Sequence, residues 1–110
     1  VINGDQLIFI GDPAADPFSN QNGELMLDEN QQLIDQVIGS PNYDIGHVLS
    51  TGGGGIANVD SVCFDGVKAG GVTGSPNPVG DAFYIDYVAH EIGHQFGADH
   101  SFNGTSGSCS

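Results

Sequence analysis

Three histidines and a glutamate in one short stretch have the spacing of a metal site. The stretch His90–His100 reads HEIGHQFGADH and fits the pattern H-E-x-x-H-x-x-G-x-x-H. In a helix, residues four positions apart lie on one face, so His90 and His94 can present two imidazoles to one ion. Gly97 is expected to end the helix, because glycine accepts a positive φ. The chain can then turn so that His100 supplies a third nitrogen.

Three nitrogen ligands are typical of a catalytic zinc ion, which keeps its fourth position open for water. Glu91 lies beside these ligands, and we expect it to act as the general base of a hydrolytic reaction. Asp99 is interpreted as structural, because the turn directs it away from the ion. The alternative is a non-catalytic zinc module that binds peptides or is purely structural, in which Cys63 or Cys109 provides a fourth ligand. A peptidase with a downstream glutamate as third ligand is disfavoured, since no glutamate follows Glu91.

At these residues the chain resembles the metzincin zinc peptidases, and among them the reprolysin-like (adamalysin-type) bacterial members. The resemblance extends upstream through Tyr43–Gly52, Gly55–Ala57 and Val62–Cys63. Two departures stand out. Reprolysins usually place aspartate directly after the third histidine, where this chain has Ser101. Their methionine turn is absent, since the single methionine is Met26, far upstream.

The resemblance implies a zinc-dependent endopeptidase that hydrolyses peptide or protein substrates. It assigns the zinc ligands to His90, His94 and His100 and the catalytic base to Glu91. It also places the substrate-binding edge strand at Gly55, Ile56 and Ala57. Because the chain is shorter than the domains it resembles, we expect residues 1–110 to be one partial catalytic domain that lacks upstream and downstream parts.

The charge of the chain excludes some partners. The net charge is −13, and Lys68 is the only lysine or arginine. No basic face is available for nucleic acid or anionic lipid, and no apolar run is long enough to cross a membrane. We expect a monomer.

Cys63 and Cys109 are the only cysteines. Their even number and the match at Cys63 predict a disulfide between them, and therefore a secreted protein. Two unpaired thiols are the alternative. Asp12 and Asp16 could bind calcium, but their spacing does not fit a calcium loop, and a role in forming turns is favoured.

The remaining pattern predicts an α/β fold, in which helices pack on a twisted mixed sheet as in the upper subdomain of a metzincin. His47, in the second expected strand, is interpreted as a hydrogen-bonded histidine and not as a ligand. The helix expected at Ala82–Phe96, which carries His90 and His94, should be buried on nearly all sides, with Asp81 as its N-cap. Asp28 is the expected N-cap of the first helix. The expected strands are Gln6–Ile10, Ile45–Ser50, Gly55–Ala57 and one around Val72, and the expected helices are Asp28–Ile38 and Ala82–Phe96.

Overall fold

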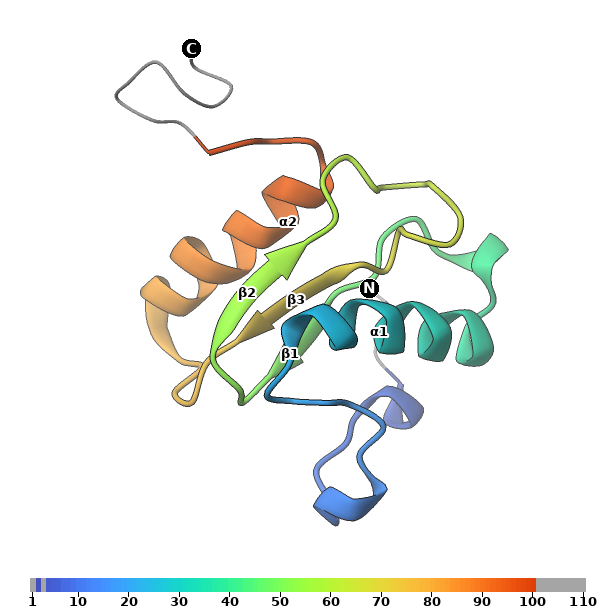
Figure 1. The fold of residues 1–110 in the computed structure, drawn as a ribbon, viewed down its shortest axis with the longest axis vertical. Coiled ribbons are helices and arrows are strands. Elements are labelled where there is room, and N and C mark those ends of the chain that lie inside the picture. Colours follow the sequence, from blue (N-terminus) through green and yellow to red (C-terminus); the bar gives the residue numbers. More distant parts are fainter. Residues whose placement is uncertain (1, 3, 101–110) are drawn as a thin grey trace.

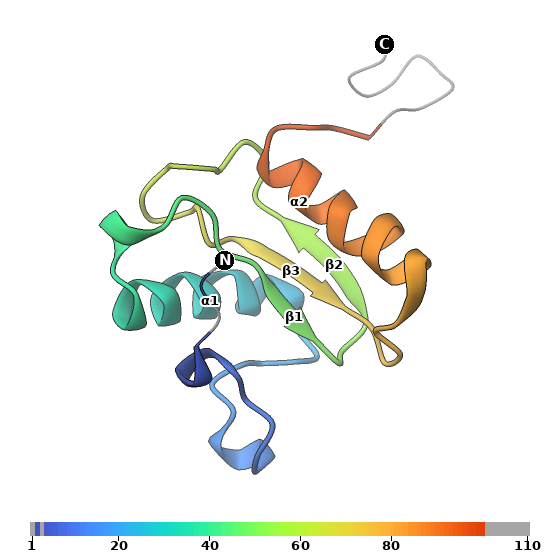
Figure 2. The same ribbon diagram turned by 180° about the vertical axis from the view of Figure 1, so that it is seen from behind.

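The computed structural model describes residue 2 and residues 4–100, and it has three layers (Figures 1 and 2). A mixed sheet of three strands lies between helix α1 (Gly23–Val37) and helix α2 (His90–Gln95). Successive residues of a strand point to opposite faces of a sheet. Accordingly, Ile56 contacts α1 at Gly23, whereas its neighbour Gly55 faces Glu91 of α2. The predicted α/β architecture is confirmed.

The sheet consists of β1 (Val48–Ser50), β2 (Gly54–Ala57) and β3 (Gly71–Gly74). Strand β3 lies in the centre, parallel to β1 and antiparallel to β2. All four residues of β3 are buried, and their small side chains let both helices approach closely. The predicted strands at these places are found, and β2 is an edge strand as expected.

Helix α1 begins five residues before its predicted start. The side chain of Asn22 caps the helix by accepting a hydrogen bond of 3.2 Å from the Leu25 N–H. Asp28, the predicted cap, therefore lies inside the helix. Buried amides tie α1 to the chain before β3: Asn30 donates to the Ala69 carbonyl at 2.7 Å, and Gln31 accepts from the Ala69 N–H at 2.8 Å.

The zinc-motif helix is one continuous helix made of π-helical turns, η4 (Ala82–Ala89), followed by α2. Asp81 precedes it but makes no side-chain capping hydrogen bond, so the predicted cap is wrong. The prediction of all-round burial is also wrong, because only one side of the helix packs on the sheet. Phe83, Glu91 and Gln95 are buried on that side. Large apolar side chains elsewhere on the helix and at its end are exposed among the described residues: Tyr84, Ile85, Tyr87 and Phe96.

The predicted N-terminal strand is not formed. Its first part lies in a 3₁₀ turn, η1 (Asp5–Leu7), in which the Leu7 N–H donates to the Gly4 carbonyl at 2.9 Å. Ile10 is 90% exposed. A strand is stable only with a pairing partner, and within the described residues the sheet consists only of β1, β3 and β2.

The apolar core is small. Ile34, Tyr43 and Ala69 are its buried cluster, and Leu7 and Ile38 pack against it. The single lysine, Lys68, closes one side by donating to the Ser40 carbonyl at 2.6 Å and to Asp65 at 2.7 Å. In the described part of the chain, no helix has the length and apolar character needed to cross a membrane.

Candidate metal centre

The three histidines of the motif converge on one point. His90 and His94 lie one turn apart, and their Nε2 atoms are 3.0 Å from each other. The Nε2 atom of His100 lies 3.0 Å from that of His90 and 3.1 Å from that of His94. The convergence expected from the spacing is therefore confirmed.

A tight turn at Gly97 brings His100 back to the helix. Gly97 has a φ of +91°, a conformation that is costly for a residue with a Cβ atom. Its N–H donates to the His94 carbonyl at 2.8 Å, and the Ala98 N–H donates to the Gly93 carbonyl at 2.9 Å. The predicted helix stop at Gly97 is confirmed.

The donor set fits zinc. Tetrahedral zinc with nitrogens at about 2.1 Å would hold them about 3.4 Å apart, so small outward shifts are sufficient. His94 Nδ1 lies 2.7 Å from the Ala98 carbonyl, so Nδ1 carries the proton and Nε2 keeps its lone pair for a metal. Among the described residues no carboxylate or cysteine joins the cluster of His90, His94 and His100. Within residue 2 and residues 4–100, the cluster thus has the three nitrogens that a catalytic zinc site uses.

Glu91 lies on the side of α2 that faces the sheet. Its carboxylate lies against Gly55 of edge strand β2, and the residue is only 8% exposed. Glu91 follows His90 directly but does not belong to the ligand cluster. A carboxylate in this place is a group that can accept a proton beside a metal.

A hydrogen-bond network that the sequence analysis did not predict holds α2 on the sheet. His47, just before β1, has Nδ1 2.7 Å from Gln95 Oε1 and Nε2 2.8 Å from Thr73 Oγ1. The Gln95 amide nitrogen donates to the Gly46 carbonyl at 2.9 Å, so its oxygen must accept. His47 Nδ1 therefore carries the proton, and Nε2 accepts from the Thr73 hydroxyl. The interpretation of His47 as a hydrogen-bonded histidine is confirmed.

Burial lowers the pKa of His47 below its ordinary value of 6.5. The hydrogen bond that His47 donates to Gln95 and the charge of Glu91 act in the opposite direction and only partly offset this effect. His47 is therefore neutral at pH 7, in agreement with the tautomer. The sequence did contain one signal: Gln95 is a polar residue on a helix that was expected to be buried, and a buried amide requires hydrogen-bond partners.

The loop after β2 holds the end of the zinc-motif helix. The Asp60 N–H donates to the His94 carbonyl at 3.0 Å, and the Ser61 N–H donates to the Gln95 carbonyl at 2.9 Å. The last carbonyls of a helix have no partner inside it. These contacts therefore fix the helix end from which the chain turns towards His100.

In the acidic loop near the N-terminus, the carboxylates accept hydrogen bonds from nearby backbone N–H groups. Asp12 accepts from the Ala14 N–H at 2.9 Å, and Asp16 accepts from the Phe18 N–H at 2.8 Å. The favoured interpretation of these acids as turn-forming is confirmed. Cys63 is exposed and forms no disulfide among the described residues. Cys109 lies outside the described residues, so the predicted bond stays a prediction.

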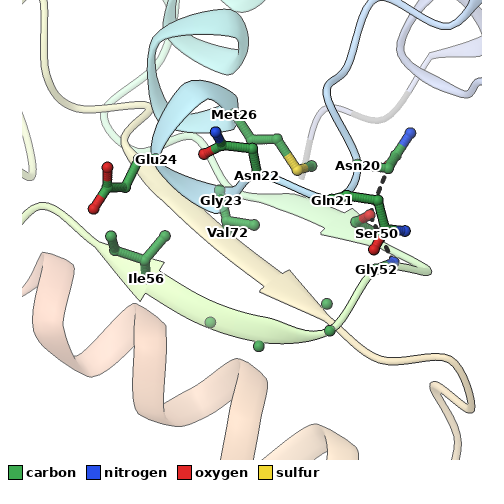
Figure 3. Close-up of a pocket in the computed structure, with 14 residues that line it drawn as sticks. Asn20, Gln21, Asn22, Gly23, Glu24, Met26, Ser50, Gly52, Ile56 and Val72 are labelled. Carbon is green, nitrogen blue, oxygen red and sulfur yellow. Dashed lines mark hydrogen bonds between the residues drawn. The ribbon is translucent and has the colours of Figure 1, made fainter.

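An open pocket of about 270 Å³ lies away from the histidines. It is bounded by the start of α1, by Met26 and by the glycines that lead into β2, on the face of the sheet opposite α2 (Figure 3). The Ser50 hydroxyl donates to Asn20 at 2.6 Å at its edge. Because the sheet separates this pocket from the histidines, we do not assign it to the metal centre.

Comparison with known proteins agrees with the geometry. Residues 6–101 match the family model described as metallo-peptidase family M12B, reprolysin-like. Searches of curated proteins and of solved structures gave no match.

Proposed function

Because the chain belongs to the reprolysin-like M12B family of metallopeptidases, we propose that it is a zinc-dependent endopeptidase with Glu91 as general base. The observation that carries this proposal is the arrangement of three converging imidazoles with a separate carboxylate beside them. A purely structural zinc site would not require that carboxylate.

The chain's own residues would divide the work as follows. His90, His94 and His100 would hold the ion, which when bound supplies Lewis-acid polarisation of the scissile carbonyl and lowers the pKa of a water molecule. Glu91 would take the proton of the attacking water and pass it to the leaving amine. Its position between the ligands and the sheet supports this role.

We also propose that the substrate backbone binds along β2 at Gly55, Ile56 and Ala57. In the described residues β2 pairs only with β3, and an edge strand can add an extended peptide by main-chain hydrogen bonds. The Glu91 carboxylate lies against the same strand. A peptide bound there would therefore run past both the base and the histidines.

Substitution of Glu91 by glutamine tests the proposal. Glutamine is nearly isosteric but cannot accept the proton, so we expect hydrolysis of casein by the full-length protein to fall by about 100- to 10,000-fold. Zinc content, measured by atomic emission, should stay at one ion per chain, because Glu91 is not a ligand. A chelator should abolish the activity of the parent protein.

Glu24→Gln is the matched control, since it removes the same charge from the exposed start of α1. It should retain parental activity. If zinc-loaded Glu91→Gln cleaves casein at the parental rate, the assignment of the base is wrong. If the zinc-loaded full-length protein binds peptides but does not cleave them, the non-catalytic module is the correct interpretation.

A further inference from the structure

The contact between Gly55 and Glu91 assigns a second role to the edge strand. A Cβ atom built on Gly55 would lie 2.7 Å from Glu91 Cδ and 2.8 Å from Cγ, with Oε1 closer still. Real Cβ atoms essentially never come so close to other heavy atoms. The Glu91 carboxylate therefore occupies the space that a side chain at position 55 would need.

We propose that Gly55 is a positioning residue, which places the Glu91 carboxylate by leaving this space open. The inference rests on the proposed function, because it concerns the base of that reaction. It differs from substrate binding along β2, since the missing side chain would point to the α2 face of the sheet and not along its edge. Gly55 pairs with Thr73 on β3, so its backbone is fixed and cannot retreat from an added methyl group.

Substitution of Gly55 should displace the Glu91 carboxylate without disturbing the fold. The atoms that a new Cβ would meet are the far end of one flexible side chain. Gly55 is also not among the glycines that have a positive φ. Gly55→Ala should therefore fold and bind zinc like the parent, with the Glu91 carboxylate displaced.

We expect Gly55→Ala to lower kcat by about 10- to 100-fold, the size of effect that misplacement by about 1 Å produces. KM should stay within about twofold, because a lost substrate contact would mainly raise KM. Gly53→Ala is the matched control. Gly53 lies two positions earlier, and a Cβ there meets nothing within 4 Å, so kcat should not change.

A readout independent of activity is the position of Glu91 itself. The chain has three glutamates, Glu24, Glu29 and Glu91, so the side-chain resonances of Glu91 can be assigned by NMR. The parent should show nuclear Overhauser contacts between the Gly55 α-protons and the Glu91 γ-protons. In Gly55→Ala the Glu91 carboxyl carbon should shift, while in Gly53→Ala it should not.

Shortening the base provides the rescue test. Asp at position 91 lacks one methylene group and would leave room for the alanine methyl. Gly55→Ala should therefore lower kcat less in a Glu91→Asp background than in the parent, which is the non-additivity expected of two residues in contact. Equal effects in both backgrounds would overturn the inference.

The outcomes separate the two proposals. An active parent with unchanged kcat and an unshifted Glu91 resonance in Gly55→Ala overturns the role of Gly55 and leaves the peptidase assignment intact. A full-length protein without activity overturns the peptidase assignment. In that case the NMR contacts still decide whether Gly55 places Glu91.

Discussion

At the scale of single residues, His47 illustrates how the neighbourhood of a metal centre controls protonation. Its two ring nitrogens bind Gln95 and Thr73, and the tautomer that satisfies both partners is neutral. A proton on Nε2 would face a hydroxyl in a site where burial already disfavours charge. The histidine therefore contributes to stability only while it is neutral.

This gives a pH dependence with a definite sign. Because the folded pKa of His47 is lowered, the unfolded chain binds more protons than the folded chain below about pH 6.5. The contribution of neutral His47 to the free energy of unfolding is therefore fully present above that pH, and it is lost as the pH falls through the pKa of His47 in the folded protein. We expect metal-free parent protein to lose stability more steeply than His47→Asn between about pH 7 and pH 5.

Urea unfolding of the two proteins at a series of pH values measures the difference. One titrating group contributes at most about 1.4 kcal/mol per pH unit to the slope. The other histidines and the carboxylates titrate in both proteins, so only the difference between the slopes reports on His47. Identical slopes would contradict the neutral, buried state of His47.

At the scale of elements, a Cβ atom added at each of the two glycines near the end of α2 should change stability in opposite directions. Gly97 has a φ of +91°, whereas Gly93 lies inside the helix, where an added Cβ would meet only Ala98 Cβ at 3.8 Å. We expect Gly97→Ala to destabilise the protein by about 1–2 kcal/mol. Gly93→Ala should stabilise it by up to about 1 kcal/mol, because alanine is the better helix former.

Chemical denaturation of the metal-free variants measures the change in the free energy of unfolding, which should fall in Gly97→Ala and rise in Gly93→Ala. Gly97→Ala should in addition weaken zinc binding, since the turn at Gly97 carries His100 to the other ligands. Zinc affinity measured by competition with a chromophoric chelator reports this effect. An equally stable Gly97→Ala variant with parental zinc affinity would show that the turn is not set by glycine.

The same elements show which features were predictable from sequence. The cluster of His90, His94 and His100 could be predicted, because the spacing of the histidines and the turn at Gly97 are set by local backbone geometry. The conformation of Gln6–Ile10 could not be predicted, because an apolar run becomes a strand only if a partner strand is available. The start of α1 was misplaced because Asn22 caps the helix before Asp28 is reached.

The contacts around Glu91 and Gln95 depend on residues far apart in the chain. His47 and Gln95 are 48 positions apart, and the sequence gives no measure of their distance in space. Gly55 was predicted as part of the edge strand, but its contact with Glu91 became visible only when the strand and helix were placed together. Burial of one side of the zinc-motif helix likewise depends on the layer that packs on it.

At the scale of the whole molecule, a small core must balance strong charge repulsion. The net charge is −13, and the one lysine is already engaged with Asp65. Among the described residues, the buried apolar side chains are few: Met26, Ile34, Tyr43, Ala69, Val72 and Phe83.

The predicted bond between Cys63 and Cys109 would act where the metal centre needs support. Cys63 lies three positions after Asp60, whose N–H holds the His94 carbonyl. The bond would fasten the chain beyond His100 to the loop that fixes the end of α2. On the chain-entropy model, closing this loop adds about 4 kcal/mol of stability.

Thiol titration of the unfolded, unreduced protein is the direct measurement. We expect no free thiol in the parent and one in Cys63→Ser, which leaves Cys109 without its partner. Reduction should lower the unfolding midpoint of the parent but leave that of Cys63→Ser unchanged, because the variant has no intramolecular bond to lose. Two free thiols per parent chain would show that the bond does not form. The end of α2 would then be held by its hydrogen bonds with the loop after β2, by the turn at Gly97 and by the contact of Gln95 with His47.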